Sequence, residues 1–254
     1  MPLSYERLCA EIPAQTDLLA ALLTEADPRL PVPTCPAWTL NQLVRHVGGV
    51  HRWAETIVRT RAAEPVPDDL VNEVAPYADE DPAFLSSWLT EGASSLVTAL
   101  RETGPEARVW TPQPGEESPE FWARHTLHET AVHRADAALA VGAPYDLSPP
   151  IAEDAIERWL TAATTPEAYG PELLGRDVTL QLLSEEGEGW RMDLLADRPR
   201  WTRASTDDPA TTTVRGPLPD LMLFLYGRPT EQLEVEGDRA LLRQWRDRAA
   251  FWLD

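Results

Sequence analysis

The stretch Arg124-His-Thr-Leu-His-Glu-Thr-Ala-Val-His-Arg-Ala-Asp136 has the periodicity of an α-helix and contains three of the five histidines of the chain. An α-helix turns by about 100° per residue, so side chains four positions apart lie on one face. Glu129 and His133 are such a pair, with His125 one turn before them and Asp136 one turn after. A carboxylate and an imidazole on one helical face form half of a metal site, whose open coordination position can activate a thiol or a water. The stretch therefore predicts a helix with a metal-binding face.

The spacing differs from that of the zinc-protease motif His-Glu-x-x-His. Here His128 and Glu129 are followed by three residues and then by His133. The extra residue rotates the second histidine away from the first and towards the glutamate. The protease interpretation is therefore excluded, and His128 is expected to pack or to lie on the surface. His125 shares the face of Glu129 and is a weaker candidate for a substitute ligand or for a group that supports the ligands.

A third ligand has to come from another part of the chain. Only His46 and His51 lie outside this helix, both in Trp38-Thr-Leu-Asn-Gln-Leu-Val-Arg-His-Val-Gly-Gly-Val-His-Arg-Trp53. Thr39 and Gln42 predict a capping box at the start of this second helix. His46 falls on the inward apolar face of the helix, whereas His51 falls nearer its edge and is expected to be a helix-end contact. His46 is the preferred third ligand.

Taken together, these motifs resemble those of the mycothiol-dependent maleylpyruvate isomerases, a family within the DinB-like metal-binding four-helix bundles. The resembling segments are Val32-Pro-Thr-Cys-Pro-Ala-Trp-Thr39, Leu43-Val-Arg-His-Val-Gly-Gly-Val-His-Arg-Trp53 and His128-Glu-Thr-Ala-Val-His-Arg-Ala-Asp136. The tail segments Leu225-Tyr-Gly-Arg228 and Val235-Glu-Gly-Asp238 resemble the C-terminal domain of that family. The resemblance thus covers most of the chain.

The resemblance implies that His46, Glu129 and His133 bind zinc or another divalent metal, with mycothiol as the thiol cosubstrate. Asp136 would be the polar residue one turn past the second histidine, and it would orient His133 or handle a proton. A salt bridge from Asp136 to a nearby arginine is the alternative. Arg228 matches an arginine of the C-terminal domain that reaches the active site, where it would bind a carboxylate or a hydroxyl cluster. The alternative for Arg228 is a plain surface position.

Composition limits the classes of function. At 254 residues, with 43% hydrophobic residues, the chain is long enough for one large domain or two small ones. A formal net charge of −20 argues against nucleic acid or anionic membranes as partners. The sequence has no apolar run long enough for a transmembrane helix, and its N-terminus lacks the basic and apolar regions of a signal peptide. We therefore expect a cytoplasmic protein. Cys9 and Cys35 are expected to be reduced packing residues, with a weakly activated thiol at Cys35 as the less favoured alternative.

The first part of the chain is predicted to be helical. The helical patterns run from Leu3 to Thr24, Leu40 to Ala62, Pro82 to Arg101 and Pro119 to Val141. Pro13 is expected to bend or interrupt the first helix. The links from the second to the third helix and from the third to the fourth are long and rich in proline and acidic residues. We expect them to cross the mouth of the bundle and to form part of a lid. Residues 1–145 are therefore predicted to be a DinB-like metal-binding four-helix bundle.

The pattern changes to a mixture of helices and strands in residues 146–254. The expected elements are a helix at Ile151 to Ala163, strands at Val178 to Leu183, Trp190 to Leu195, Trp201 to Ser205 and Thr211 to Val214, a helix at Leu218 to Tyr226, a strand at Leu233 to Val235 and a helix at Arg239 to Leu253. This part is predicted to be a small α+β domain, similar to the sterol-carrier-like module of the family. The predicted fold class of the whole chain is α+β.

The predicted function is that of a mycothiol-dependent metalloenzyme. Coordination to zinc deprotonates a thiol at neutral pH, whereas a free thiol has a pKa near 8.5. The thiolate would catalyse cis–trans isomerisation of a maleylpyruvate-like substrate, or S-transfer to an electrophile. The alternatives are a zinc-dependent hydrolase that uses metal-bound water and a non-catalytic metal- or thiol-binding protein. The expected partners are a small-molecule substrate and a low-molecular-weight thiol, and the sequence does not indicate the oligomeric state.

Overall fold

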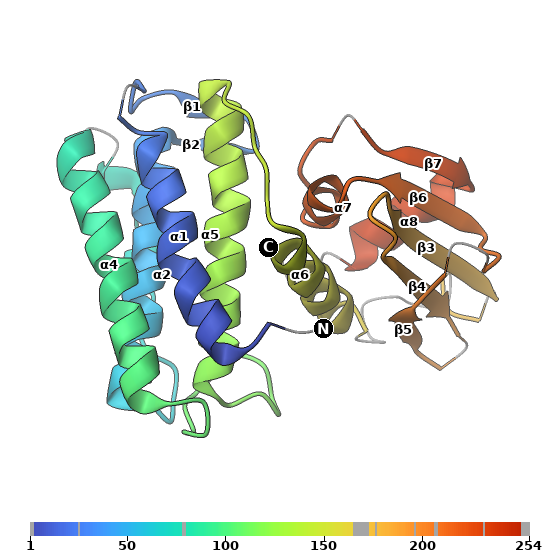
Figure 1. Cartoon of the computed structure of the whole chain (residues 1–254), viewed down its shortest axis with the longest axis horizontal. Helices are drawn as coiled ribbons and strands as arrows, with labels where there is room; N and C mark the ends of the chain where they lie inside the picture. The colour runs from blue at the N-terminus through green and yellow to red at the C-terminus, as the bar shows by residue number, and fades with distance from the viewer. Residues whose placement is uncertain are drawn as a thin grey trace. The chain divides into compact units, whose positions relative to one another are not determined.

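The chain divides into two compact units, Leu3–Tyr145 and the part from Asp146 onward, in a computed structural model (Figure 1). The structure describes residues 3–24, 26–77, 80–164, 173–175, 177–195, 197–205, 208–230 and 232–249. Long helices form the first unit, and a sheet with helices forms the second, which confirms the predicted α+β class. Within the described part of the chain, no helix is both long and apolar enough to span a bilayer.

The first unit consists of four long helices, a two-stranded antiparallel hairpin and two short helical turns. Their bounds are α1 Tyr5–Ala21, β1 Pro31–Val32, β2 Cys35–Thr39, α2 Leu40–Thr60, α3 Asp69–Asn72, η1 Ala75–Tyr77, α4 Pro82–Thr103 and α5 Pro119–Val141. The long helices agree with the sequence patterns to within three residues at each end. The hairpin, α3 and η1 are additions that the patterns do not predict.

Local sequence signals account for where the helices begin. α2 begins with the predicted capping box, in which the Thr39 hydroxyl accepts from the Gln42 backbone N–H at 3.4 Å. The Gln42 side chain in turn accepts from the Thr39 backbone N–H at 2.9 Å. α4 begins after Asp81, whose carboxylate accepts from the Ala83 backbone N–H at 2.9 Å. These bonds satisfy amides that have no partner within the helix.

Pro13 does not interrupt the first helix, so that expected alternative is wrong. α1 is continuous from Tyr5 to Ala21. A proline inside a helix removes one backbone hydrogen bond. However, Leu8, Ile12 and Leu19, on both sides of Pro13, are fully buried. The free energy of burying these side chains offsets the missing hydrogen bond.

Neighbouring long helices of the bundle run either parallel or antiparallel to each other. The Tyr5 hydroxyl at the start of α1 donates to the Leu100 carbonyl near the end of α4 at 2.7 Å, so α1 and α4 are antiparallel (Figure 1). The Thr103 hydroxyl at the end of α4 donates to the Val58 carbonyl near the end of α2 at 3.3 Å, so α2 and α4 are parallel. Because α2 and α4 point the same way, the link between them has to return along the bundle.

The two long links therefore lie in different places, and the lid stays a prediction. The α2–α4 link, residues 61–81, packs against α2 so closely that a Cβ atom on Gly49 would lie 2.0 Å from the Leu70 carbonyl oxygen. The α4–α5 link contacts the far end of α2, where the backbone N–H of Trp110 donates to the Ala62 carbonyl at 2.6 Å. Only the α2–α4 link comes near the predicted ligand His46, as shown below.

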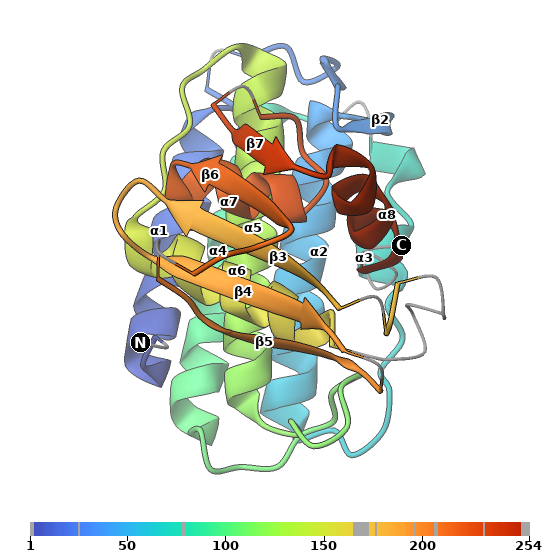
Figure 2. The same cartoon turned by 90° about the vertical axis from the view of Figure 1, so that its right-hand side faces the viewer.

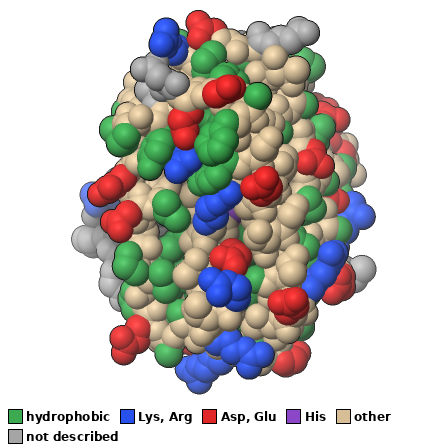
Figure 3. Space-filling view, turned by 90° about the vertical axis from the view of Figure 1, so that its left-hand side faces the viewer, with side chains coloured by type: hydrophobic (Ala, Val, Ile, Leu, Met, Phe, Trp, Pro, Cys, Tyr) green, Lys and Arg blue, Asp and Glu red, His purple; other side chains and the backbone are tan. Residues whose placement is uncertain are grey.

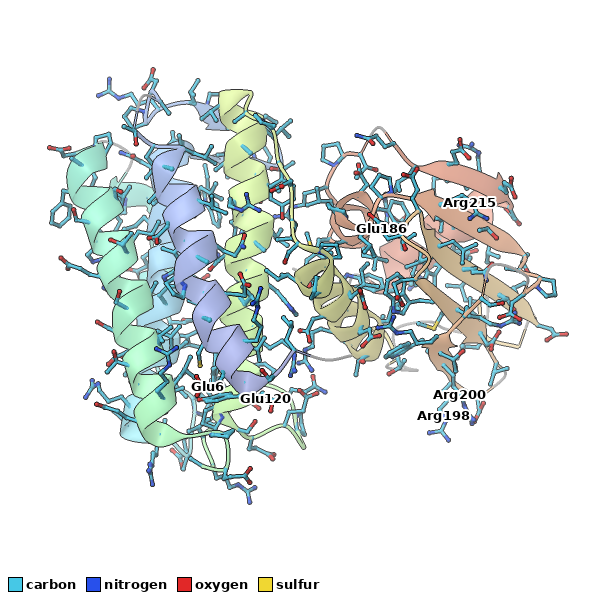
Figure 4. The ribbon with its side chains drawn as sticks, viewed as in Figure 1. Glu6, Glu120, Glu186, Arg198, Arg200 and Arg215 are labelled. Carbon is cyan, nitrogen blue, oxygen red and sulfur yellow. The ribbon has the colours of Figure 1, made fainter. Side chains whose placement is uncertain are left out.

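Apolar side chains fill most of the interior of the bundle, and its charged side chains lie mainly on the outside among polar and apolar ones. One buried cluster joins α1, α2, α4 and the hairpin, with members such as Leu19, Val32, Leu43, Val44 and Leu89. Acidic and basic side chains are interspersed on the face that Figure 3 shows. Glu6 and Glu120 lie at the end of the bundle where α1 and α5 begin (Figure 4). This distribution matches the amphipathic patterns of the helices.

The described residues of the second unit form a five-stranded sheet and three helices. Their bounds are α6 Pro149–Ala162, β3 Val178–Ser184, β4 Gly189–Leu194, β5 Pro199–Arg203, β6 Thr212–Gly216, α7 Leu218–Leu225, β7 Glu234–Gly237 and α8 Arg239–Ala249. The strand order is β5-β4-β3-β6-β7, with β3 and β6 parallel and the other pairs antiparallel (Figure 2). All elements expected in this unit occur with slightly shifted ends. The last residues of the expected final helix, 250–253, lie outside the described residues.

The core of the second unit lies between its sheet and its helices. Trp190 of β4 is buried, and its indole N–H donates to Glu157 of α6 at 3.3 Å. Trp159 of α6 and Trp245 of α8 are buried with their ring centroids 5.4 Å apart. Buried aromatic side chains thus connect the helices to one another and to the sheet.

Candidate metal centre

Three predicted ligands from two helices meet inside the first unit. The Glu129 Oε2 atom lies 3.3 Å from His133 Nε2 and 4.0 Å from His46 Nε2. One ligand atom from each residue lies within 4.8 Å of the others, and the two imidazole centroids are 5.0 Å apart. Two imidazole nitrogens and a carboxylate are a donor set that suits zinc. The arrangement therefore fits the predicted site, although metal binding itself stays a prediction.

Each imidazole is held by a hydrogen bond at its other nitrogen. His46 Nδ1 lies 2.8 Å from the Val71 carbonyl of α3, to which it donates. His133 Nδ1 lies 2.8 Å from Asp136 Oδ2, one turn further along α5. With Nδ1 of each ring engaged, the Nε2 atoms of both rings face Glu129. Partners of this kind fix the tautomer and the orientation of metal-ligating histidines.

The charge states at the site depend on burial and on these partners. Burial lowers the pKa of His46 to about 4, and the proximity of His133 acts in the same direction. Burial also favours the neutral form of His133, but hydrogen bonds from its ring to Asp136 and Glu129 raise its pKa well above the ordinary value. Burial would raise the pKa of Glu129, but the hydrogen bond with His133 and the nearby imidazoles lower it. The site thus pairs the ionised carboxylate of Glu129 with a positive charge on His133, a charge that a bound cation would replace.

The β1–β2 hairpin covers one side of the site. The Trp38 ring centroid lies 4.7 Å from that of His46 and 6.2 Å from that of His133. The Thr34 hydroxyl donates to Asp136 Oδ1 at 2.6 Å, and Cys35 Sγ lies 3.7 Å from Asp136 Oδ2. The sequence patterns miss Thr34 and assign Cys35 mainly to packing. No spacing rule could have found them, because Thr34 and Asp136 are 102 positions apart.

Cys35, His133 and Asp136 form a second group of potential ligands within the same 4.8 Å limit. The two groups share His133, so they describe one polar centre. The side chain of Asp136 is fully buried, and it accepts from His133 and Thr34. Asp136 therefore connects His133 to the hairpin, and its role in orienting His133 stays a prediction.

His51 contradicts its predicted role as a helix-end contact. It lies in the middle of α2, is fully buried, and its Nε2 atom is 3.0 Å from the Thr130 hydroxyl of α5. Burial lowers its pKa to about 3. The error has a geometric cause. His51 lies at the edge of the apolar face of α2, and in the bundle this edge packs against α5.

The remaining predicted residues lie outside this group of ligands. His125 stacks on Phe121 at 5.8 Å, one turn before Glu129, and is half-buried. His128 is buried, which agrees with a packing role. Cys9 is buried in α1, and burial raises the pKa of its thiol to about 11. Arg228 belongs to the second unit, where it follows Gly227 after α7 and its guanidinium donates to the Tyr226 carbonyl at 2.8 Å.

The fold and the site define a two-unit protein with a helical bundle, a candidate metal centre inside it, and an attached α+β unit. Residues 9–138 match the family profile described as the mycothiol maleylpyruvate isomerase N-terminal domain, and residues 150–244 match the corresponding C-terminal domain. The chain therefore belongs to the mycothiol maleylpyruvate isomerase family, as its motifs indicate.

Two solved structures share the fold. They are crystal structures of the mycothiol-dependent maleylpyruvate isomerase and of a point mutant of it. Each is 18% identical in sequence, with a TM-score of 0.64, and the match covers 92% of this chain and 93% of that chain. No curated protein matches the sequence. At this level of identity the likeness establishes the fold of both units.

Proposed function

We propose that the protein is a mycothiol-dependent isomerase that binds a divalent cation, with zinc as the first candidate, through His46, Glu129 and His133. The main support is the convergence of two Nε2 atoms on the Glu129 carboxylate, while each Nδ1 atom is bonded to Val71 or Asp136. A divalent cation held there would keep a bound thiol deprotonated at neutral pH. Membership of the family supports mycothiol as that thiol.

The side chains around the site have separate tasks in this proposal. Glu129 is the most accessible of the three ligands, with 30% of its side chain exposed, so the thiol would enter from its side. Trp38 lies over the imidazoles and would limit the space for substrate. Asp136 orients His133. In a chain with a net charge of −20, Arg228 would provide local positive charge for an anionic substrate or for the thiol cosubstrate.

The proposed reaction is a cis–trans isomerisation by reversible addition of a thiolate. The sulfur forms a bond to one carbon of an electron-poor double bond, and the electron pair of that bond moves into the adjacent carbonyl group. The former double bond is then a single bond and can rotate. Return of the electron pair breaks the carbon–sulfur bond and releases the thiolate and the trans isomer. The thiol is regenerated, so it acts catalytically.

An assay with defined components tests the proposal. The metal-loaded protein is incubated with mycothiol and maleylpyruvate, and separately with mycothiol and a general electrophile. We expect isomerisation that depends on both the metal and the thiol and that is lost in Glu129→Gln. The matched control is Glu157→Gln, a half-buried carboxylate of the second unit that pairs with Arg203, and we expect it to retain full turnover.

Other outcomes of the same assay would identify a different function. A stable conjugate with the electrophile but no isomerisation would indicate an S-transferase. Turnover of an ester or amide without any thiol would indicate a hydrolase that uses metal-bound water. Metal binding with no turnover at all would indicate a binding protein. Loss of turnover in Cys35→Ser, with fold and metal retained, would place the nucleophile in the protein. Because the reaction requires a reduced thiol, we also propose a cytoplasmic location.

A further inference from the structure

Asp136 is a buried carboxylate whose two oxygens are bonded to different parts of the chain. Only 1% of the residue is exposed. Its Oδ2 atom accepts from His133 Nδ1 at 2.8 Å, and its Oδ1 atom accepts from the Thr34 hydroxyl at 2.6 Å. An ionised carboxylate is costly to bury unless hydrogen bonds satisfy its oxygens. The position of the carboxylate therefore depends on the hairpin as well as on its own helix.

The hairpin that carries Thr34 is anchored on both sides of this residue. Val32 precedes it and is fully buried in the apolar cluster of the bundle. Thr39 follows it and forms the capping box of α2 with Gln42. Anchoring at both ends restricts the positions open to the Thr34 hydroxyl, so its bond to Asp136 is a fixed feature of the fold.

We propose that Thr34 is a positioning residue of the metal centre, acting through Asp136 on His133. The bond from the Thr34 hydroxyl fixes the plane of the carboxylate, and the carboxylate then fixes the His133 ring so that its Nε2 atom faces Glu129. Outer partners of metal ligands typically change metal affinity by about 10- to 100-fold when they are removed. The inference rests on the proposed function, because it concerns the affinity of the proposed metal site.

Thr34 is the stronger of the two hairpin contacts to this carboxylate. Its hydroxyl lies at 2.6 Å from Asp136, whereas Cys35 Sγ lies at 3.7 Å and a thiol is a weak donor. A metal held instead by Cys35, His133 and Asp136 would have to displace the 2.8 Å bond between His133 Nδ1 and Asp136 Oδ2. The observed hydrogen bonds thus favour Asp136 as a support for His133 over Asp136 as a ligand.

The experiment compares Thr34→Val, which removes the hydroxyl at nearly constant size, with Thr34→Ser, which keeps it. Thr98→Val is the matched control, since its hydroxyl donates to the Ser94 carbonyl on the exposed side of α4. Zinc affinity is measured by competition with a chromophoric chelator. In the metal-free protein, proton NMR follows the low-field resonance of the His133 Nδ1 proton, whose protection from exchange reports the bond to Asp136.

We expect Thr34→Val to bind zinc about 10- to 100-fold more weakly and to expose the His133 proton to exchange. We expect Thr34→Ser to stay within about threefold of the parent protein, and Thr98→Val to match it. Asp136→Asn should lose at least as much affinity as Thr34→Val. The double variant should lose no more than Asp136→Asn alone, because one residue acts through the other. If Thr34→Val fails to fold, Thr34→Ala replaces it in the same comparison.

Three results would overturn the inference. Parent-like zinc affinity in Thr34→Val is the first, and additive losses in the double variant are the second. The third is a thiolate charge-transfer band in the cobalt-loaded protein, without added thiol, that Cys35→Ala removes, since this would make Cys35 a ligand. If the parent protein binds no metal, the metal centre itself fails. The NMR resonance then decides alone whether Thr34 orients His133.

Discussion

The bundle and the α+β unit differ in where a cluster of charged groups lies. The bundle has charged side chains on its outside but also holds one cluster in its interior, where His46, His133 and Asp136 have little exposed surface. In the second unit, Arg203 lies at the surface with 37% of its side chain exposed, and it pairs with Glu153 at 3.0 Å, with Glu157 at 2.6 Å and also with Glu188. All five histidines of the chain belong to the bundle. Among the residues that the structure describes, the bundle is the unit that gathers titratable groups in its interior.

This difference supports the proposal that the buried cluster of the bundle, and not the surface cluster around Arg203, serves a function. Burying ionisable groups costs free energy that exposed ion pairs do not cost. Buried ionisable groups with shifted pKa values cluster at functional sites, where a shifted pKa or a bound ion is needed. The surface network around Arg203 needs no such explanation, because each charge there has a partner and contact with water.

The largest effect is expected from removing a ligand in the bundle. His46→Ala, Glu129→Ala and His133→Ala should each lose the metal, because two remaining donors bind zinc weakly. We expect less than one tenth of the parent metal content after dialysis, measured by elemental analysis, while Arg203→Met keeps its metal. Full retention of metal in all three ligand variants would remove the proposed site.

A large effect is also expected where the α2–α4 link touches α2. A methyl group in Gly49→Ala would lie 2.0 Å from the Leu70 carbonyl oxygen, so the link has to move together with the Val71 carbonyl that holds His46. We expect metal affinity to fall by about 10- to 100-fold, measured by chelator competition. In the control Gly48→Ala, the methyl group would meet the ring of Trp88, so stability should fall while the metal stays bound. Equal metal affinity in both variants would contradict this prediction.

Arg228→Ala tests whether the α+β unit contributes to function at all. We expect the variant to keep its fold and its metal but to lose at least about tenfold in kcat/KM, the scale of a contact of about 1.4 kcal/mol. Steady-state kinetics with both thiol and acceptor varied would show which of the two ligands the guanidinium binds. Parent-like kinetics would assign Arg228 to the surface of its unit.

The stability of the protein should depend on pH through His51, a buried histidine in the interior of the bundle. Burial lowers the pKa of His51 to about 3 in the folded state, below the ordinary value of 6.5. Between these two values the unfolded chain takes up a proton at His51 and the folded chain does not. The contribution of His51 to stability is therefore complete above pH 6.5 and decreases as the pH falls towards 3. The expected slope is about 1.4 kcal/mol per pH unit.

Urea unfolding at a series of pH values measures this slope. His51→Gln keeps a polar group opposite Thr130 but cannot titrate, so its stability should fall less steeply between about pH 6 and pH 4. The other histidines are common to both proteins and cancel in the difference. Parallel curves for the two proteins would show that His51 does not carry the effect.

The smallest effect is expected at the surface of the α+β unit. Arg203→Met removes the guanidinium from its three carboxylate partners but keeps much of the apolar contact of the side chain. Because the group is partly exposed, we expect the free energy of unfolding to change by about 1 kcal/mol or less. Thermal and urea unfolding measure this change, and a much larger loss would show that the network holds the unit together.

The sequence by itself determined the local parts of this protein. The Thr39–Gln42 pair predicted the capping box at the start of α2, and the apolar periodicity predicted the four long helices. The spacing of Glu129 and His133 predicted that they share a face, because helical geometry depends only on the residues between them. These features follow from hydrogen bonds and rotations within a few residues, which a sequence pattern records directly.

Only the tertiary structure decided which distant groups meet. Thr34 reaches Asp136 across 102 positions, and His51 is buried because α5 places Thr130 against it. The Val71 carbonyl reaches His46 because α2 and α4 are parallel, which forces their link back along the bundle past Gly49. Such contacts arise from how helices pack and how links return, and many sequences with the same local periodicity would pack differently. The spacing could therefore predict that Glu129 and His133 share a face, and the motifs pointed to Asp136, but the Thr34 hydroxyl and the Val71 carbonyl could not be predicted.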